Sequence, residues 1–175
     1  MTGLARIIVE TGAFKTGEFT LASGEKSSFY IDAKLASTDP VVLSALAQHA
    51  ALYAPGHQAI AGTVLGGVPF ATALSLETGR PLLLVRPEPK EHGTGSQIEG
   101  QAPDGARVLV AEDVVTTGGS LIRAIEAVRD EGYTVDHAVT IVDRQAGGHE
   151  ALAEAGVKLH ALVTLKELEQ AAEEI

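Results

Sequence analysis

The sequence predicts an α/β fold in which a mostly parallel sheet is flanked by helices. Short apolar runs alternate with amphipathic, helix-like segments at least three times, which is typical of strands joined by helical crossovers. The chain has 19 glycines and only 4% aromatic residues, as suits a protein with many tight turns. Its 175 residues are enough for one domain that buries about two-thirds of its unfolded surface.

The N-terminal region predicts a helix followed by a β-hairpin. An apolar stripe of Leu4, Ile7 and Ile8 indicates a helix over residues 3–11. The next stretch, GEFTLASGEKSSFYIDAKL, has the pattern of two short strands joined by a turn at 23–25. We therefore expect a hairpin before the first strand of the main sheet.

Two further helices and two strands are expected in the middle of the chain. Pro40 begins a helix that runs to about Tyr53, because proline is favoured in the first helical turn. A strand over 58–63 leads into a second helix, for which Pro69 is the expected first residue and Gly79 the expected end. The apolar run PLLLVR then predicts a strand over 81–86.

Residues 87–106 have no helix or strand period and are rich in glycine and proline. A structureless loop of this length is usually functional or mobile. After it, strands and helices alternate again. The expected elements are a strand over 107–111, a helix over 120–131, a strand over 134–143, a helix over 149–155, a strand over 157–163 and a last helix with a capping box of Thr164 and Glu167.

Charge and composition exclude several kinds of function. The net charge of −10 argues against a nucleic-acid or anionic-membrane partner, since both require a basic face. There is no cysteine, so disulfides, thiolate metal sites and cysteine nucleophiles are excluded. The N-terminus lacks a basic leader pattern, and no apolar run approaches the ~18 residues of a membrane span. We expect a cytoplasmic protein.

The sharpest candidate site is the stretch AEDVVTTGGS, at the end of one predicted strand. Ligands of open parallel sheets bind beyond the carboxyl ends of the strands. Residues 116–120, Thr-Thr-Gly-Gly-Ser, precede a helix, so backbone N–H groups, hydroxyls and the helix dipole can hold a phosphate. The Walker A and dinucleotide-binding patterns are both absent.

Two carboxylates, Glu112 and Asp113, stand just before this phosphate cradle. They would repel a phosphate, so they must face sugar hydroxyls, a divalent cation or a proton in transit. A phosphorylated ribose satisfies these requirements, because its phosphate and its hydroxyls lie at different places on one ligand.

The stretch VLVAEDVVTTGGS closely resembles the 5-phosphoribosyl 1-diphosphate (PRPP) motif of type I phosphoribosyltransferases. Four other stretches narrow the resemblance to the orotate phosphoribosyltransferases. They are GEFTLASGEKSSFYIDAKL, GTVLGGVPFATALSLETGRPLLLVR, KEHGTGSQIEG and TIVDRQAGGHEALAEAGVKLHALVTL. It covers roughly residues 10–168. The resemblance implies the type I fold as one domain over 1–175, with a hairpin hood over about 1–35, a core over 36–175 and a mobile catalytic loop over 87–106.

The resemblance also implies an activity and its residues. The protein would be a pentosyl-transferring glycosyltransferase that joins orotate to PRPP, giving orotidine 5′-monophosphate and diphosphate in UMP biosynthesis. Mg²⁺ would be held through PRPP and water, with no direct protein ligand, and a homodimer would form in which loop 87–106 completes the neighbouring site. The implied catalytic residues are Asp113, Lys90 and His92. The implied PRPP-binding residues are Arg86, Lys90, His92, Glu112, Asp113, Val114, Val115, Thr116, Thr117, Gly118, Gly119 and Ser120. The implied orotate-binding residues are Thr116, Arg144, Lys26, Phe29 and Tyr30.

The chain departs from the family pattern at two positions. Pro87 replaces the second basic residue of the loop, and Ala22 stands where many members have lysine. Two alternatives remain: phosphoribosyl transfer to another nucleobase, and a nucleotide-sensing regulator on the same fold. Arg144 favours a carboxylated base such as orotate over another nucleobase, because a guanidinium suits a carboxylate. The net charge of −10 disfavours a regulator that binds nucleic acid.

Overall fold

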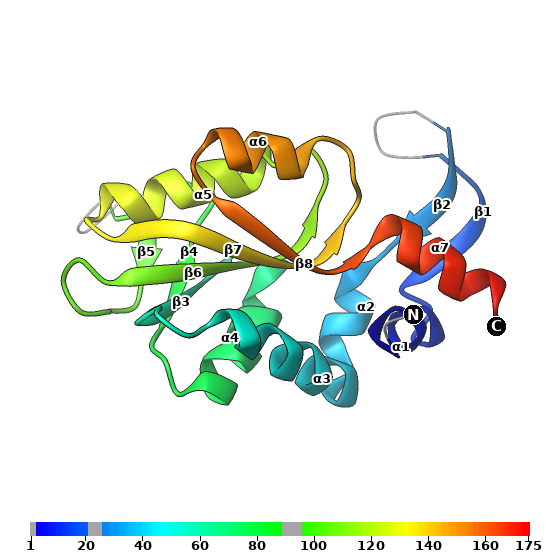
Figure 1. Cartoon of the computed structure of the whole chain (residues 1–175), viewed down its shortest axis with the longest axis horizontal. Coiled ribbons are helices and arrows are strands. Elements are labelled where there is room, and N and C mark those ends of the chain that lie inside the picture. The colour runs from blue at the N-terminus through cyan, green and yellow to red at the C-terminus, as the bar shows by residue number, and fades with distance from the viewer. Residues whose placement is uncertain (1–2, 21–25, 89–95) are drawn as a thin grey trace.

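The computed structural model describes residues 3–20, 26–88 and 96–175, and its core is a six-stranded sheet (Figure 1). The strand order is β5-β4-β3-β6-β7-β8. Neighbouring strands pair in parallel except β4 and β5, which are antiparallel. The strands are β3 (Ala59–Thr63), β4 (Leu82–Val85), β5 (Ile98–Glu99), β6 (Arg107–Val115), β7 (Thr134–Asp143) and β8 (Lys158–Thr164). The predicted mostly parallel α/β sheet is confirmed.

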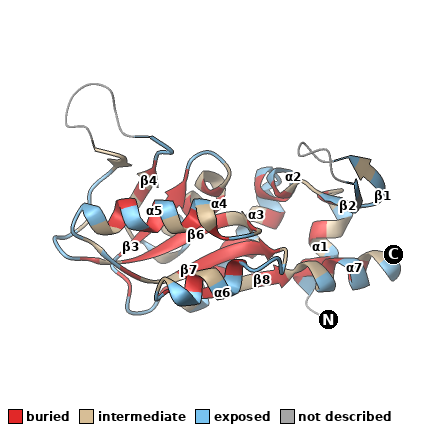
Figure 2. Ribbon diagram, turned by 90° about the horizontal axis from the view of Figure 1, so that it is seen from above, coloured by how far each residue is buried: buried red, intermediate tan, exposed pale blue. Residues whose placement is uncertain are grey.

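Helices cover both faces of this sheet. One apolar cluster includes Leu46, Phe70 and Ile141, and a second on the opposite face includes Ile125 and Leu152. Buried residues accordingly concentrate in the central strands and the inner helix faces (Figure 2). The first cluster joins the sheet to α1 (Gly3–Glu10), α2 (Ala33–Thr38), α3 (Pro40–Ala50), the 3₁₀ turn η1 (Ala51–Tyr53), α4 (Gly67–Thr78) and α7 (Leu165–Glu173), and the second joins it to α5 (Gly119–Asp130) and α6 (Gly148–Glu154). None of the described helices is long and apolar enough to cross a membrane.

The predicted hairpin is present as a separate two-stranded antiparallel sheet of β1 (Phe14–Thr20) and β2 (Lys26–Ile31). It lies at the end of the molecule that also carries α1 and α7 (Figure 1). The turn predicted at 23–25 and the departure at Ala22 lie outside the described residues. Phe29 and Tyr30 are neighbours on β2, so their side chains point to opposite faces of the strand. Phe29 packs against the core, and Tyr30 is 45% exposed.

Several element boundaries match the prediction closely. β7 has the predicted bounds, and the last helix begins with the expected capping box, in which the Thr164 backbone N–H donates to Glu167 Oε2 at 2.8 Å. The α4 helix ends where Gly79 adopts a left-handed φ of 65°.

The structure corrects the prediction at four places. The prediction misses α2, a helix of only six residues that begins where the Asp32 side chain accepts from the Lys34 N–H. Pro69 is the third residue of α4 instead of the first; it still lies in the first turn, where no intrahelical N–H bond is lost. Residues 96–106 are not wholly irregular, because β5 pairs with β4. The strand predicted over 107–111 is too short, since β6 continues along β7 to Val115.

Candidate active site

The predicted phosphate cradle lies between the end of β6 and the start of α5. Gly118 has a left-handed φ of 83°, and the Gly148 N–H donates to the Thr116 carbonyl at 3.0 Å. A side chain at Gly118 would press on the backbone of Gly148, so glycine allows this close approach. The first N–H groups of α5 have no intrahelical acceptor and remain available to an anion. A cavity of about 110 Å³ is lined by Glu112 and residues 114–121.

Glu112 is the buried member of the acid pair, with 8% exposure. Its Oε1 accepts from the Thr63 hydroxyl at 2.7 Å and from the Asp113 backbone N–H at 3.0 Å. Burial, together with the neighbouring Asp113 carboxyl, raises the pKa of Glu112 to about 8. At neutral pH the protonated form of this side chain is therefore favoured, and its proton can be shared with the Asp113 carboxyl or donated to a ligand.

Asp113 lines a different cavity from Glu112, although the two carboxyls are close enough to interact directly. Its Oδ1 accepts from the Val114 N–H at 2.8 Å, and its backbone carbonyl accepts from the Thr140 hydroxyl at 3.2 Å. A Cβ at Gly66 would overlap the Asp113 carboxylate, so the β3–α4 loop packs closely on this acid. The two adjacent carboxyls thus face different cavities.

A second cavity, of about 350 Å³, opens between the ends of β3 and β4 and the start of α5. We call it the β3–β4 cavity. Arg86 enters it from the end of β4, and its Nη1 lies 3.4 Å from Glu99 Oε1. The lining residues are Thr63, Val64, Gly66, Val85, Arg86, Pro87, Glu88, Gln97, Glu112, Ser120, Arg123 and Ala124.

The third cavity, of about 260 Å³, lies under the hairpin, and we call it the hairpin cavity. Arg144, directly after β7, holds its guanidinium carbon 5.4 Å from the centroid of the Phe29 ring. The Phe29 ring is stacked in turn on Phe14, with centroids 6.0 Å apart. The lining residues are Phe29, Tyr30, Ile31, Asp32, Ala33, Lys34, Asp113, Val114 and Arg144.

The structure thus brings together most of the residues that the sequence singles out. Residues 114–120 line the cradle, and Phe29, Tyr30 and Arg144 meet Asp113 in the hairpin cavity. Thr116 lines the cradle and is absent from the lining of the hairpin cavity. Lys26 pairs with Thr20 at the start of β2 and is likewise not among the lining residues. Lys90 and His92 lie outside the described residues.

Several residues of these cavities were missed by the sequence-based prediction. Thr63 and Gly66 belong to the stretch AGTVLGGVP, whose position at a strand end is suggestive, but the prediction assigned no residue there. The Val64–Leu65 peptide bond within that stretch is cis. Arg123 gives no signal in the sequence, because a charged residue on a helix is usually solvated. Lys34 depends on α2, which was not predicted.

Comparison with known proteins gives a consistent result. The family described as "Phosphoribosyl transferase domain" matches residues 42–158. The orotate phosphoribosyltransferase of Pyrococcus furiosus is 46% identical over 173 residues, which cover 97% of this chain and 95% of that protein. The crystal structure of orotate phosphoribosyltransferase from Aeropyrum pernix superposes with a TM-score of 0.86 at 40% identity, covering 98% of this chain and 99% of the other. That of Mycobacterium tuberculosis H37Rv in complex with PRPP has a TM-score of 0.80 at 30% identity, covering 95% and 97%.

Proposed function

The chain belongs to the orotate phosphoribosyltransferases, and from this membership we propose that its three cavities hold the three parts of one substrate pair. The enzyme transfers the 5-phosphoribosyl group of PRPP to orotate, giving orotidine 5′-monophosphate and diphosphate in pyrimidine biosynthesis. The observation that supports the assignment is that the cavities adjoin one another. The β3–β4 cavity and the cradle share Glu112 and Ser120, and the cradle and the hairpin cavity share Val114.

The ribose 5-phosphate unit would bind along the end of β6. Residues 116–120 would bind the 5′-phosphate with backbone N–H groups and hydroxyls. Glu112 and Asp113 would bind the ribose hydroxyls, with protonated Glu112 able to donate and Asp113 able to accept. A single ligand then explains why two carboxyls stand beside a site built for an anion.

Orotate would bind in the hairpin cavity. Arg144 has no ion pair among the residues that the structure describes, and a guanidinium can bind a carboxylate through two parallel hydrogen bonds. Phe29 would pack against the flat pyrimidine ring, and Tyr30 lies at the exposed rim. Asp113 lines this cavity and the sugar lies beside it, so this carboxylate is placed to handle the proton of the reacting base. Lys26 and Thr116 would also contact the base.

The departing diphosphate would bind in the β3–β4 cavity, near Arg86. Lys90 and His92 would come to it from loop 87–106 and would neutralise the charge that develops as the C1′–oxygen bond breaks. Mg²⁺, when bound with PRPP, would withdraw charge from the same oxygens. The described residues hold no group of three or more metal-ligating side chains, but Mg²⁺ is often held by substrate phosphates, water and one or two carboxylates. A Mg²⁺ held through PRPP and water, with no direct protein ligand, fits this lining.

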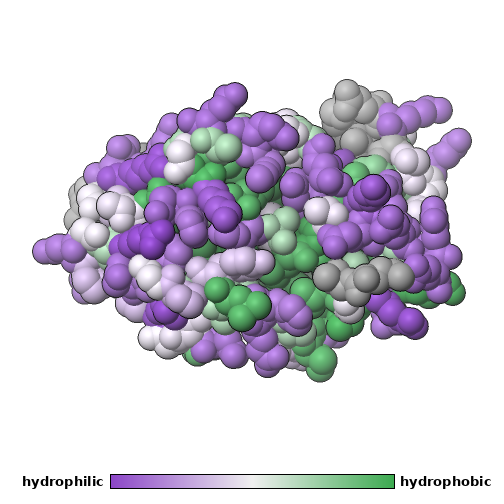
Figure 3. Space-filling view, viewed as in Figure 1, coloured by the Kyte–Doolittle hydropathy of each residue, from purple (hydrophilic) through white to green (hydrophobic). Residues whose placement is uncertain are grey.

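We also propose a homodimer in which loop 87–106 completes the neighbouring site. An apolar face supports it: Val41 on α3 and Leu76 on α4 are 77% and 79% exposed, and Leu76 lines a groove between these two helices. Figure 3 shows hydrophobic side chains gathered over these two helices. An exposed apolar patch of this kind usually marks an interface. Light scattering during size exclusion should give twice the mass of the chain, and V41E/L76E should give the single mass.

Substrate choice is tested by following orotate consumption in ultraviolet absorbance with PRPP and Mg²⁺. We expect turnover of orotate and none of adenine, hypoxanthine or uracil. Turnover of another base without turnover of orotate would favour the alternative nucleobase enzyme. A filter-binding assay with RNA and DNA at low salt tests the regulator alternative, and we expect no retention, because the net charge is −10.

A further inference from the structure

Arg123 is a cation of the β3–β4 cavity that neither the sequence motifs nor the family resemblance assigns. It is an exposed residue, the fifth of α5, and it lines the cavity together with Arg86. Its Nη2 lies 3.3 Å from the Ser120 hydroxyl, and its Nη1 would lie 3.7 Å from a Cβ built at Gly119. The guanidinium therefore folds back toward the beginning of its own helix.

This orientation is electrostatically unfavourable in the absence of an anion. The N-terminus of a helix carries a partial positive charge, which repels a cation. Within the described parts of the chain, Arg123 forms no ion pair that would offset this repulsion. Arg129, at the other end of the same helix, instead donates to the carbonyls of Val135 and Ala155. Arg123 is thus the arginine of α5 whose charge is left for a ligand.

The charges around the cavity indicate which ligand part needs it. Arg86 and Arg123 are the lining cations, and Glu88 and Glu112 are the lining acids. Part of the Arg86 charge is offset by Glu99 at 3.4 Å, and the residue after Arg86 is the uncharged Pro87. Without Arg123, the described lining would offer a multiply charged anion little or no net positive charge.

We propose that Arg123 is a binding residue for the diphosphate group of PRPP, acting from the same chain alongside Arg86. The inference rests on the proposed assignment of the diphosphate to the β3–β4 cavity. Arg123 lines the β3–β4 cavity and is not among the residues that line the cradle. It should therefore bind the diphosphate group of PRPP and not the 5′-phosphate.

The test compares two fragments of the substrate. Titration calorimetry with inorganic diphosphate and Mg²⁺ reports on the β3–β4 cavity, and titration with ribose 5-phosphate reports on the cradle. For R123Q we expect diphosphate to bind about ten- to a hundredfold more weakly, because a hydrogen bond to a charged group is lost. Ribose 5-phosphate should bind as it does to the parent protein. R123K should recover part of the diphosphate affinity, since it keeps the charge but not the fork of donors.

The matched control is R6Q, which removes an exposed arginine from α1, where it pairs with Glu10 at 2.9 Å. It changes the net charge equally and should leave both affinities unchanged. In steady-state kinetics, R123Q should raise the PRPP KM by a similar factor and leave the orotate KM unchanged. Thermal denaturation of each variant checks that the fold is retained.

Two results would overturn the inference. Equal diphosphate affinity in R123Q and the parent would remove Arg123 from the site, and an equal loss for ribose 5-phosphate would mean that it serves the 5′-phosphate or the fold in general. Failure of the proposed function is separately visible. If the parent binds diphosphate in an Arg123-dependent way but does not turn over orotate, the assignment of the base is wrong and the diphosphate contact stands.

Discussion

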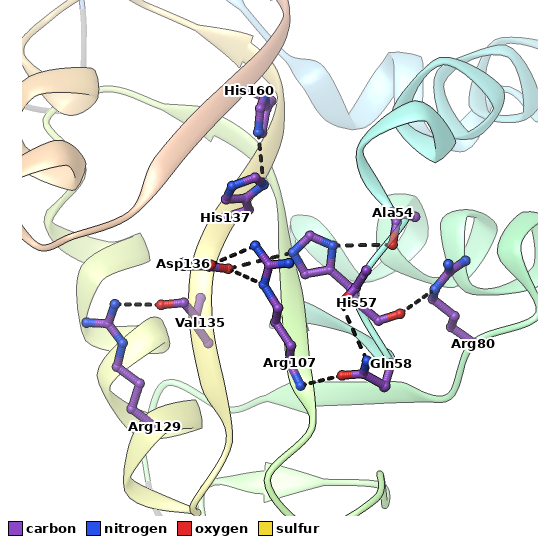
Figure 4. Close-up of polar contacts among 11 residues, drawn as sticks. Ala54, His57, Gln58, Arg80, Arg107, Arg129, Val135, Asp136, His137 and His160 are labelled. Carbon is purple, nitrogen blue, oxygen red and sulfur yellow. Dashed lines mark hydrogen bonds and ion pairs between the residues drawn. The ribbon is translucent and has the colours of Figure 1, made fainter.

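The two ends of the central sheet both gather charged side chains, but they use them differently. At the amino ends of the strands, Arg107 donates to both carboxylate oxygens of Asp136, at 2.8 and 2.7 Å (Figure 4). Arg80 donates to the His57 carbonyl at 2.8 Å. At the carboxyl ends, Arg123 and Arg144 have no ion-pair partner within the described residues. Cations that are satisfied inside the chain hold the fold together, and cations left over are available to a ligand.

The amino ends of the strands also carry a cluster of three histidines, which has no counterpart among the described residues of the site. His160 Nε2 lies 3.3 Å from His137 Nδ1, and the rings of His137 and His57 are 5.4 Å apart. Burial lowers the pKa of His160 to about 4 and also lowers that of His57. The imidazoles of His57 and His160 are therefore neutral packing elements at pH 7. Burial acts on Glu112 in the same way, but there the neutral form faces a cavity.

The largest effect should come from removing the charge of Asp113. D113N keeps the shape of the side chain but cannot take a proton, so kcat should fall by about a hundredfold or more. Initial rates at saturating PRPP and orotate measure this, and circular dichroism checks the fold. An unchanged kcat would remove Asp113 from the catalytic residues.

Next in size is the loss of the Arg144 guanidinium. R144A should raise the orotate KM about ten- to a hundredfold, because a paired hydrogen bond to the carboxylate is lost. The PRPP KM should change little, since Arg144 lines only the hairpin cavity among the three described. Equal increases in both KM values would contradict the assigned role.

A smaller effect is expected on the stability of the protein, through Glu112 at the carboxyl ends of the sheet strands. An unfolded glutamate ionises near pH 4.5, whereas folded Glu112 keeps its proton up to about pH 8. The folded state binds more protons in this window, so the free energy of unfolding should decrease as pH rises through it. E112Q should flatten that decrease by about 1–2 kcal/mol in urea denaturation series without ligand. Parallel slopes for E112Q and the parent would argue against a buried, protonated Glu112.

The smallest effect is a pH dependence of stability with the opposite sign. It comes from His160, near the amino ends of the sheet strands. An unfolded histidine titrates near pH 6.5, but folded His160 stays neutral down to about pH 4. The unfolded state binds more protons there, so stability should decrease as pH falls from 6.5 toward 4. H160F would keep a ring against Tyr53, whose centroid is 4.2 Å away, and should flatten this decrease by about 1 kcal/mol, discounted for partial exposure. A parent protein equally stable at both pH values would contradict this.

The same contrast explains what the sequence could predict. The cradle and the acid pair lie within one short stretch, so their chemistry can be read from neighbouring residues. β7 was predicted with its correct bounds because ten residues give a clear strand pattern. The two-residue β5 and the six-residue α2 are too short to give any period.

Contacts between residues that are far apart in the chain could not be predicted from the sequence. The spacing of His57, His137 and His160 predicts no chemistry, and only the pairing of β7 with β8 brings the last two together. Arg123 joins Arg86 because α5 lies against β4, which the sequence of α5 alone does not reveal. The convergence of Phe29 and Arg144 depends in the same way on how the hairpin packs.

The continuation of β6 through Glu112 and Asp113 has a stereochemical consequence. Glu112 lines the β3–β4 cavity and Asp113 lines the hairpin cavity, so the two cavities meet at adjacent residues of β6. If diphosphate binds in the first of these cavities and orotate in the second, the nitrogen of the base would approach C1′ on the side opposite to the departing diphosphate. Such an arrangement inverts the anomeric carbon, so an α-configured donor should yield a β-configured nucleotide.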